Sequence, residues 1–207
     1  MYESVGDYRL YPNSRMEGGS KARLFHATVL AMTPAGLVIR DATEADCAAI
    51  AEIYAQTVEA RDATMDLEPR PPEYFAGAIA GLGDRERFVV LERGGSLLGY
   101  GRIMAYSDRA GYRPAAETAV YLRRELRRQG LGSHLKRWIV EECRRFGYHH
   151  LVAKVYARNR ASIEYNRRFG YELVGVQREI GWVGGRWEDV AIMQLVLDDV
   201  PPPGGPP

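Results

Sequence analysis

Residues 118–133 read TAVYLRRELRRQGLGS, and this stretch decides the fold of the 207-residue chain. Its first five residues are rich in β-branched and aromatic side chains, which favours a strand. Two glycines follow, and apolar side chains then recur at helical spacing as far as Gly147. The stretch therefore predicts a strand, a glycine-containing loop and an amphipathic helix. In such an arrangement the unpaired N–H groups of the first helical turn face outward and favour an anion.

Further strands and helices are predicted on both sides of this stretch. Thr43 and Asp46 are spaced as a helix-capping pair, and Gly94-Gly95 is typical of a hairpin turn. Strands and helices in this order give an α/β (α+β) fold, with a mixed sheet and helices on its faces. The expected strands lie at 37–39, 88–91, 97–105, 118–122, 151–156, 171–180 and 187–197, and the helices at 43–58, 74–79, 131–146 and 159–169.

The length and patterning predict one domain with a segment on either side. A chain of 207 residues, 46% of them hydrophobic, can bury one substantial core. Residues 1–36 show no hydrophobic period and are expected to form an N-terminal extension, partly ordered or disordered. Residues 37–198 form the domain, and the Pro/Gly-rich residues 199–207 are expected to form a disordered tail. Function is expected within 37–198.

Composition argues against several classes of protein. Lys plus Arg (28) balance Asp plus Glu (27), so no overall positive field favours nucleic acid or a membrane surface. No apolar run approaches a membrane span and no signal peptide is evident, which predicts a cytoplasmic location. Cys47 and Cys143 stand far apart in helical stretches, which favours buried thiols over a disulfide or a metal cluster. We therefore expect no metal.

The loop at 127–133 is the candidate phosphate site. Gly130 and Gly132 let the backbone approach an anion, and the arginines at 127 and 128 add charge, with Lys136 or Arg137 as further cations. A P-loop would need Gly-Lys-Ser/Thr, which is absent, and a dinucleotide fingerprint would need Gly or Ala where Leu135 stands. Both alternatives are disfavoured, whereas a Gly pair taken alone also fits a tight turn with a solvated basic face.

These residues resemble the GNAT superfamily of acyl-CoA N-acyltransferases. The superfamily signature Arg/Gln-x-x-Gly-x-Gly/Ala is matched by Arg127, Gly130 and Gly132, and residues 159–171 resemble its Asn-x-x-Ser/Ala helix that ends in Gly-Phe/Tyr. Within the superfamily the chain is similar to the phosphinothricin and methionine sulfoximine acetyltransferase branch. That similarity rests on residues 109–121 and 185–190. The resemblance covers about residues 37–198 in the right order, which is more specific than any single motif.

The resemblance implies a GNAT fold, a splayed and mostly antiparallel sheet of about seven strands flanked by about four helices. It implies acetyl-CoA as the acetyl donor, a small-molecule amine as the acceptor and, from the branch, a homodimer. The pantetheine arm would lie along 118–122 and the pyrophosphate on 128–133. Asn159 and Ser162, which also fit an ordinary helix N-cap and first turn, would face the pantetheine or the sulfur. The expected donor-binding residues are Val120, Tyr121, Leu122, Arg127, Arg128, Gln129, Gly130, Leu131, Gly132, Ser133, Asn159 and Ser162.

The chemistry of acetyl transfer directs attention to three residues. An amine with a pKa of about 10.4 is protonated at neutral pH, so a base must remove a proton. Glu117 matches the family position for that base, and the amide near Val120 is the expected oxyanion donor. The family places a Tyr, and the branch a His, where this chain has Asn166, which can donate a hydrogen bond but is no general acid. We expect Asn166 to line the sulfur site, with Tyr156 or Tyr121 as alternative acids.

Acceptor recognition is expected at the loop before Glu117, where Arg109, Tyr112 and Arg113 could contact a carboxylate. The branch tends to carry a Lys where this chain has Val183, which argues against phosphinothricin itself as the acceptor. Two other functions stay open. One is a protein or peptide N-acetyltransferase, and the other is an acetyl-CoA-binding module with weak catalysis.

Overall fold

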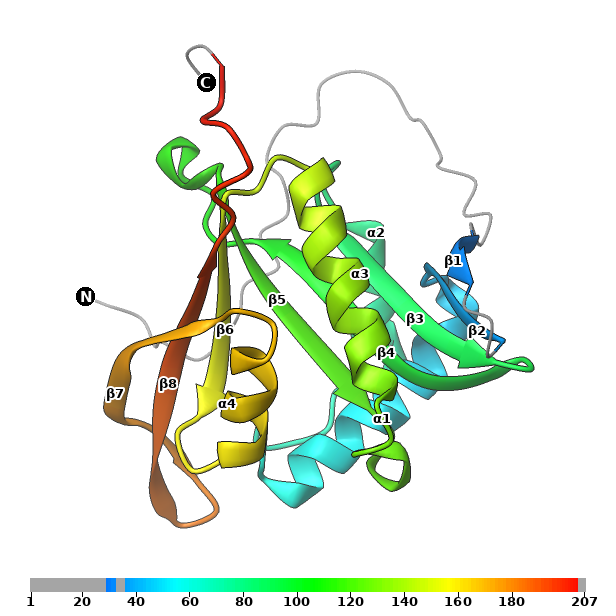
Figure 1. Cartoon of the computed structure of the whole chain (residues 1–207). Helices are drawn as coiled ribbons and strands as arrows, with labels where there is room; N and C mark the ends of the chain where they lie inside the picture. Colours follow the sequence, from blue (N-terminus) through cyan, green and yellow to red (C-terminus); the bar gives the residue numbers. More distant parts are fainter. Residues whose placement is uncertain (1–28, 33–35, 205–207) are drawn as a thin grey trace.

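A computed structural model describes residues 29–32 and 36–204 of the chain (Figure 1). These residues form one eight-stranded sheet and four α-helices. The elements are β1 (Val29–Met32), β2 (Leu37–Asp41), α1 (Cys47–Ala60), α2 (Pro72–Ala80), β3 (Arg87–Arg93), β4 (Ser96–Ala105), β5 (Ala115–Leu122), α3 (Leu131–Arg145), β6 (His150–Tyr156), α4 (Arg160–Arg167), β7 (Glu172–Val183) and β8 (Arg186–Val196).

The strand order in the sheet is β1-β2-β3-β4-β5-β6-β8-β7, and only the β5–β6 pair is parallel. The predicted mixed, mostly antiparallel sheet is therefore confirmed, and every strand and helix expected from the hydrophobic pattern is present. The sequence predicts about seven strands, and the eighth is β1, within the expected extension 1–36. The rest of that extension, 1–28 and 33–35, lies outside the described residues. The boundaries at 36/37 and 198/199 stay predictions.

Helices cover both faces of the sheet (Figure 1). Helices α1 and α2 pack on one face, where Phe75 and Tyr100 belong to the same buried cluster. Helix α3 crosses the other face, and its Ile139 shares a core with residues of β6 and β8, against which α4 also packs. Both cysteines, Cys47 and Cys143, are buried free thiols, as expected.

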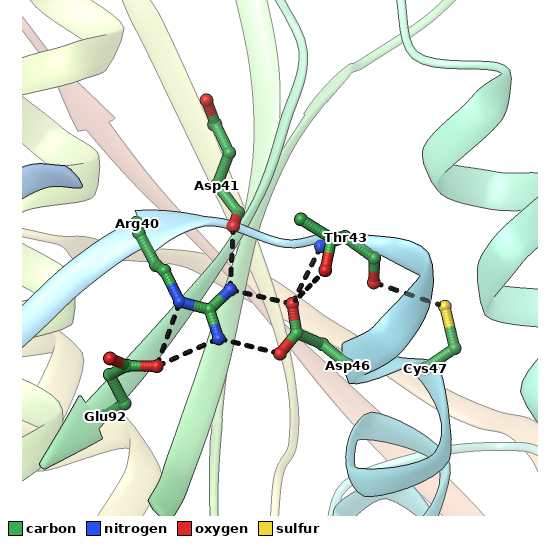
Figure 2. Close-up of polar contacts among 6 residues, drawn as sticks. All are labelled: Arg40, Asp41, Thr43, Asp46, Cys47 and Glu92. Carbon is green, nitrogen blue, oxygen red and sulfur yellow. Dashed lines mark hydrogen bonds and ion pairs between the residues drawn. The ribbon is translucent and has the colours of Figure 1, made fainter. Parts of the chain in front are cut away.

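A cluster around Arg40 joins β2, β3 and the start of α1 (Figure 2). The Arg40 guanidinium donates to both carboxylate oxygens of Asp46, at 2.7 and 2.8 Å, and its Nε donates to Glu92 on β3 at 2.9 Å. Asp46 also accepts from the backbone N–H and the hydroxyl of Thr43 at 2.8 and 2.9 Å. The capping pair expected from the sequence is therefore confirmed. It closes the 3-10 turn Glu44–Asp46 that leads into α1.

The sheet separates between β5 and β6. Their parallel ladder consists of three pairs, which end at Glu117 opposite Val152. Beyond this point β5 continues to Leu122 alongside β4 and diverges from β6, which pairs with β8 to Tyr156. Figure 1 shows the two strands opening as a V below their paired ends. The splay implied by the resemblance is therefore confirmed.

The chain after β8 stays attached to the domain for a few residues. Val200 is buried and donates its backbone N–H to the Leu197 carbonyl at 2.9 Å. Asp199 forms an ion pair with Arg144 at 2.9 Å. The described residues 201–204 contain neither a helix nor a strand, and 205–207 lie outside the described residues.

Candidate active site

The backbone of β5 directs alternate groups into the gap. The Arg123 N–H donates to the Leu98 carbonyl at 3.0 Å, and the Tyr106 N–H donates to the Ala115 carbonyl at 3.2 Å. Because hydrogen bonding alternates along an antiparallel strand, the odd-numbered residues of β5 bond to β4. The N–H and C=O groups of Val120 and Leu122 therefore point toward the gap, where the ladder to β6 has already ended. An extended chain such as a pantetheine arm can hydrogen-bond along this edge.

A cavity of about 100 Å³ occupies the gap. Its walls come from both faces of the sheet, because Lys136 and Asn166 line it from the α3/α4 face and Ala63 from the segment that follows α1. The structure brings together in its wall five of the residues predicted from the sequence. These are Val120, Tyr121, Asn159, Ser162 and Asn166.

The loop before α3 has the geometry of a phosphate cradle. Gly130, with φ of 78°, is the N-cap of the 15-residue α3, and Arg128 also has a positive φ, 63°. The first turn of this helix has backbone N–H groups available for an anion. A Cβ at Gly132 would stand 3.3 Å from both a Leu122 methyl group and the Tyr165 hydroxyl. The loop therefore closes tightly on the end of β5, and a side chain at 132 would fill part of that space.

Ion pairs already engage one of the loop cations. Arg127 Nη1 lies 3.0 Å from Asp62 Oδ2, and Arg124 Nη1 lies 2.7 Å from the same oxygen. Arg128 is exposed, and the side chain of Gln129 donates to the Glu125 carbonyl at 3.1 Å. Of the two arginines expected to hold phosphate, Arg128 projects into solvent and Arg127 has an acidic partner.

Lys136 does not take the place expected for it as a phosphate-loop cation. Its side chain is 2% exposed, and its Nζ lies 3.4 Å from Thr118 Oγ1 and 4.0 Å from the centre of the Tyr171 ring. Helical spacing explains this position, because Lys136 stands three residues before Ile139 and seven before Cys143, both fully buried. The spacing of Lys136 from these two apolar residues is the signal in the sequence that could have indicated its burial.

Asn159 and Asn166 are both engaged within the fold. Asn159 is the N-cap of α4, accepts from the Ser162 N–H at 3.1 Å and donates to the Asp62 carbonyl at 3.0 Å. The N-cap role weighed for Asn159 is therefore present alongside its place in the cavity wall. Asn166 is buried and donates its amide N–H to the Ser162 carbonyl at 2.9 Å.

Glu117 lies where β5 and β6 part, on the α1/α2 face of the sheet. Its Oε2 is 2.8 Å from Nζ of Lys154 on β6, and Lys154 itself lines the cavity.

Sequence reasoning missed Arg102, which alternation on β4 places on the same face as the buried Tyr100. Burial alone would lower the pKa of Arg102, but neighbouring Tyr121 and Glu117 raise it above its ordinary value. Arg102 therefore stays charged beside the candidate base.

The other predicted side chains lie apart from the cavity wall. Arg109, Tyr112 and Arg113 are exposed around the short 3-10 turn Ala110–Tyr112, and Tyr112 packs edge-on against Tyr106. They belong to the loop that enters β5 two residues before Glu117, but they do not line the cavity.

The tyrosines considered as acids are engaged in contacts within the fold. Burial raises the pKa of Tyr156 to about 12, and its hydroxyl donates to the Thr64 carbonyl. Tyr165, which neighbours Asn166 in α4, donates its hydroxyl to the Gly132 carbonyl at 2.7 Å, and burial raises its pKa. Tyr121 packs its ring against Tyr100 and Tyr54, on the α1/α2 face.

Comparison with known proteins agrees with this geometry. A family model described as an acetyltransferase (GNAT) domain matches residues 39–192. The chain belongs to the GNAT acetyltransferase family. As a GNAT protein it is an acyl-transferring enzyme of the N-acetyltransferase class.

The chain is similar to three individual acetyltransferases of this family. It is 33% identical over 168 residues to the L-methionine sulfoximine/L-methionine sulfone acetyltransferase of Salmonella typhimurium, a match that covers 79% of this chain and 96% of the relative. A phosphinothricin acetyltransferase of Sinorhizobium meliloti, solved in complex with AcCoA, is 30% identical with a TM-score of 0.76, over 82% of this chain and 95% of that one. A ribosomal-protein-alanine N-acetyltransferase of Brucella melitensis is 33% identical with a TM-score of 0.74, over 77% of this chain and 99% of that one.

The GNAT chain fits an acetyl-CoA donor by its own geometry. The gap at β5 offers backbone groups for an extended arm, and the loop before α3 offers N–H groups for a pyrophosphate. In the part of the chain that the structure describes, no helix is both long and apolar enough to span a bilayer.

Proposed function

We propose that this enzyme transfers the acetyl group of acetyl-CoA to the amino group of a small molecule, an amino acid or an analogue such as methionine sulfoximine or phosphinothricin. The observation that carries the proposal is the cavity between β5 and β6, which is lined from both faces of the sheet and has Glu117 beside it. The relatives named for methionine sulfoximine and phosphinothricin support this class of acceptor.

In this proposal the donor and the acceptor bind on opposite faces of the sheet. The donor lies on the α3/α4 face, with its pyrophosphate on the loop before α3 and its thioester in the cavity. The acceptor amine approaches from the α1/α2 face, where Glu117 removes its proton directly or through water. The amine nitrogen then attacks the thioester carbonyl, and the N–H group of Val120, which points into the gap, donates to the oxyanion. The carbon–sulfur bond breaks and the electron pair leaves on sulfur.

Arg102 supports a carboxylate-bearing acceptor. It is the cation on the face of β4 and β5 that carries Glu117, and a guanidinium binds a carboxylate through two parallel hydrogen bonds. Arg109, Tyr112 and Arg113 are exposed and do not line the cavity, so any contact they make with the acceptor would be outside its wall.

The test is release of CoA thiol from acetyl-CoA with a panel of amino acids, methionine sulfoximine, phosphinothricin, polyamines and peptides. We expect turnover on an amino acid or analogue and a loss of about 10²- to 10⁴-fold in Glu117→Gln, the usual contribution of a general base. Glu141→Gln, the same change at an exposed carboxylate of α3, is the control. A Glu117→Gln enzyme as active as the wild type would contradict the role of Glu117.

One observation favours a second candidate. The similarity to a ribosomal-protein-alanine N-acetyltransferase supports a peptide N-terminus as acceptor. Turnover confined to the peptides of the panel would establish that function. Tight acetyl-CoA binding without turnover on any acceptor would instead favour the binding module.

We further propose that the enzyme forms a homodimer through β7. This edge strand exposes Val174, Ile180 and Trp182, and Trp187 of β8 stacks edge-on against Trp182 at 5.0 Å between ring centres. An exposed apolar stripe on an unpaired edge strand favours pairing with a second copy. Sedimentation of the wild type should give twice the monomer mass, and Ile180→Lys should shift the enzyme to monomer. A monomeric wild type would overturn this assembly.

A further inference from the structure

The ammonium group of Lys136 lies inside the protein, in the wall of the cavity between β5 and β6. Its polar contact is the Thr118 hydroxyl at 3.4 Å, and its Nζ faces the Tyr171 ring at 4.0 Å. Among the described residues no carboxylate forms an ion pair with it. Burying an ammonium without a counter-ion is strongly unfavourable, because the charge loses its hydration. Such a group in a cavity wall points to a ligand that brings or develops negative charge there.

The position of Lys136 fits the leaving sulfur rather than the acceptor amine. Lys136, Thr118 and Asn166 line the cavity from the α3/α4 face, whereas Glu117 lies on the opposite face. The negative charge that develops on this side during transfer belongs to the CoA thiolate. Asn166 donates an amide N–H to the Ser162 carbonyl, and an amide is not acidic enough to act as a general acid.

The phenols on this side are also engaged. The Tyr171 hydroxyl is 2.9 Å from Thr118 Oγ1, and the Tyr165 hydroxyl donates to the Gly132 carbonyl. Lys136 is therefore the side chain on this side of the cavity that can carry a proton for transfer.

We propose that Lys136 is a catalytic residue that stabilises the departing CoA thiolate and gives it a proton, the role that Asn166 does not fill. This inference rests on the proposed acetyl transfer. When the carbon–sulfur bond breaks, the electron pair moves to sulfur and a proton passes from Nζ to sulfur. Free CoA thiol and a neutral Lys136 result. The nitrogen loses two protons, one to Glu117 before the attack and one from the cationic nitrogen of the tetrahedral intermediate, and both pass through Glu117 to solvent. Lys136 regains one proton from solvent, so the whole transfer releases one proton.

The surroundings of Lys136 suit this exchange. Burial lowers the pKa of Lys136 to about 7, so both forms are populated near neutral pH. Of the groups that face it, burial raises the pKa of Cys143 to about 12 and raises the pKa values of Tyr171 and Tyr165, so these stay neutral. Across the cavity Lys154 is paired with Glu117.

The first test needs no turnover. CoA is bound to the enzyme and its thiol is titrated by the ultraviolet absorbance of the thiolate. A free thiol of this kind has a pKa of about 8.5, and an adjacent ammonium should lower it by about one unit or more in the wild type. Lys136→Met, which keeps an unbranched side chain one atom shorter and removes the charge, should abolish this shift. Arg145→Met, which removes an exposed cation at the far end of α3, should keep it.

The second test uses the wild-type acceptor reaction. We expect Lys136→Met to lower kcat about 100-fold at pH 6.5, the scale of a lost general acid, while acetyl-CoA affinity measured by calorimetry stays within about threefold. The wild-type kcat should fall as pH rises, because Lys136 loses its proton. The pH profile of Lys136→Met should lack this alkaline limb, the decrease in kcat at higher pH. A purely structural role for Lys136 would leave the limb in place.

The outcomes separate the two proposals. If the wild type lowers the pKa of the bound CoA thiol but acetylates no acceptor, the proposed function is wrong. The contact proposed between Lys136 and the sulfur would still be supported. Identical thiol titrations and identical pH profiles in wild type and Lys136→Met would overturn the role of Lys136 alone. Acetylation of Lys136 itself, detected by intact mass, would also contradict it by making this residue an acceptor.

Discussion

Arg127 and Asp62 form an ion pair, 3.0 Å between Nη1 and Oδ2, that joins the loop before α3 to the segment after α1. The same Asp62 oxygen binds Arg124, and the Asp62 carbonyl accepts from the N-cap Asn159. The pair occupies the guanidinium that the resemblance assigns to the donor phosphates. A phosphate that binds this loop therefore competes with Asp62 for Arg127.

Asp62→Asn should strengthen acetyl-CoA binding. Removal of the acidic partner frees Arg127, and a pair of this exposure is worth about 0.5–1 kcal/mol, so the dissociation constant should fall about two- to fivefold. Calorimetry at low and high salt should show the gain shrinking with salt. Glu52→Gln, which breaks the neighbouring pair with Arg123, is the matched control. Weaker binding in Asp62→Asn would mean that Asp62 orders the loop instead.

Gly132→Ala should weaken donor binding. The new Cβ would meet Leu122 and Tyr165 at 3.3 Å, so the loop or β5 must shift by a few tenths of an ångström. We expect a loss of about tenfold in acetyl-CoA affinity, ~1.4 kcal/mol, and a lower melting temperature. Gly77→Ala on α2 meets no atom within 4 Å and should raise stability by up to ~1 kcal/mol without affecting affinity. Equal affinities in the two variants would argue against a tight cradle.

Arg102→Met should impair acceptors that carry a carboxylate. Loss of its charge-assisted hydrogen bonds should raise KM for an amino-acid acceptor about tenfold or more, since such bonds are worth ~1.5–3 kcal/mol. KM for the corresponding amine without the carboxylate should change little. Arg113→Met, measured in parallel, tests the exposed loop. A larger effect there than in Arg102→Met would move acceptor recognition to the mouth of the site.

Asp46→Asn should destabilise the fold at neutral pH. Partial burial raises the pKa of Asp46, but hydrogen bonds from Arg40 and Thr43 outweigh it and leave the pKa below its usual value (Figure 2). A lowered carboxyl pKa contributes stability above the unfolded pKa of about 3.9 and loses it as pH falls through the folded value. Urea unfolding should therefore show a deficit of about 1–3 kcal/mol at pH 7 that narrows below about pH 4.

Glu44→Gln, a change at an exposed carboxylate of the same turn, should show a much smaller deficit. A difference between Asp46→Asn and wild type that stayed constant down to pH 3 would contradict the role assigned to the ionised carboxylate.

Local patterns were enough to place the secondary structure of the domain from β2 onward, although they missed β1. Apolar alternation placed the strands, helical spacing placed α1 and α3, and the Thr43–Asp46 pair marked where the first helical segment begins. The phosphate loop was also visible, because glycines between a strand and an amphipathic helix constrain neighbouring backbone directly. The sequence by itself therefore determined the order of elements, the family resemblance and the half of the site that one continuous segment builds.

Only the tertiary structure decided what fills the gap between β5 and β6. Lys136 reads as one more cation in a basic stretch, yet α3 rotates it onto Thr118 and Tyr171, which comes 35 positions later in the chain. Arg102 and Glu117 share one face of the sheet because β4 and β5 pair in a single register. Such contacts depend on how a whole helix packs on a sheet, where burial and desolvation change what a charged side chain can do. A local sequence pattern does not show how much burial and desolvation change the free energy of a charged side chain, because these terms depend on residues distant in the chain.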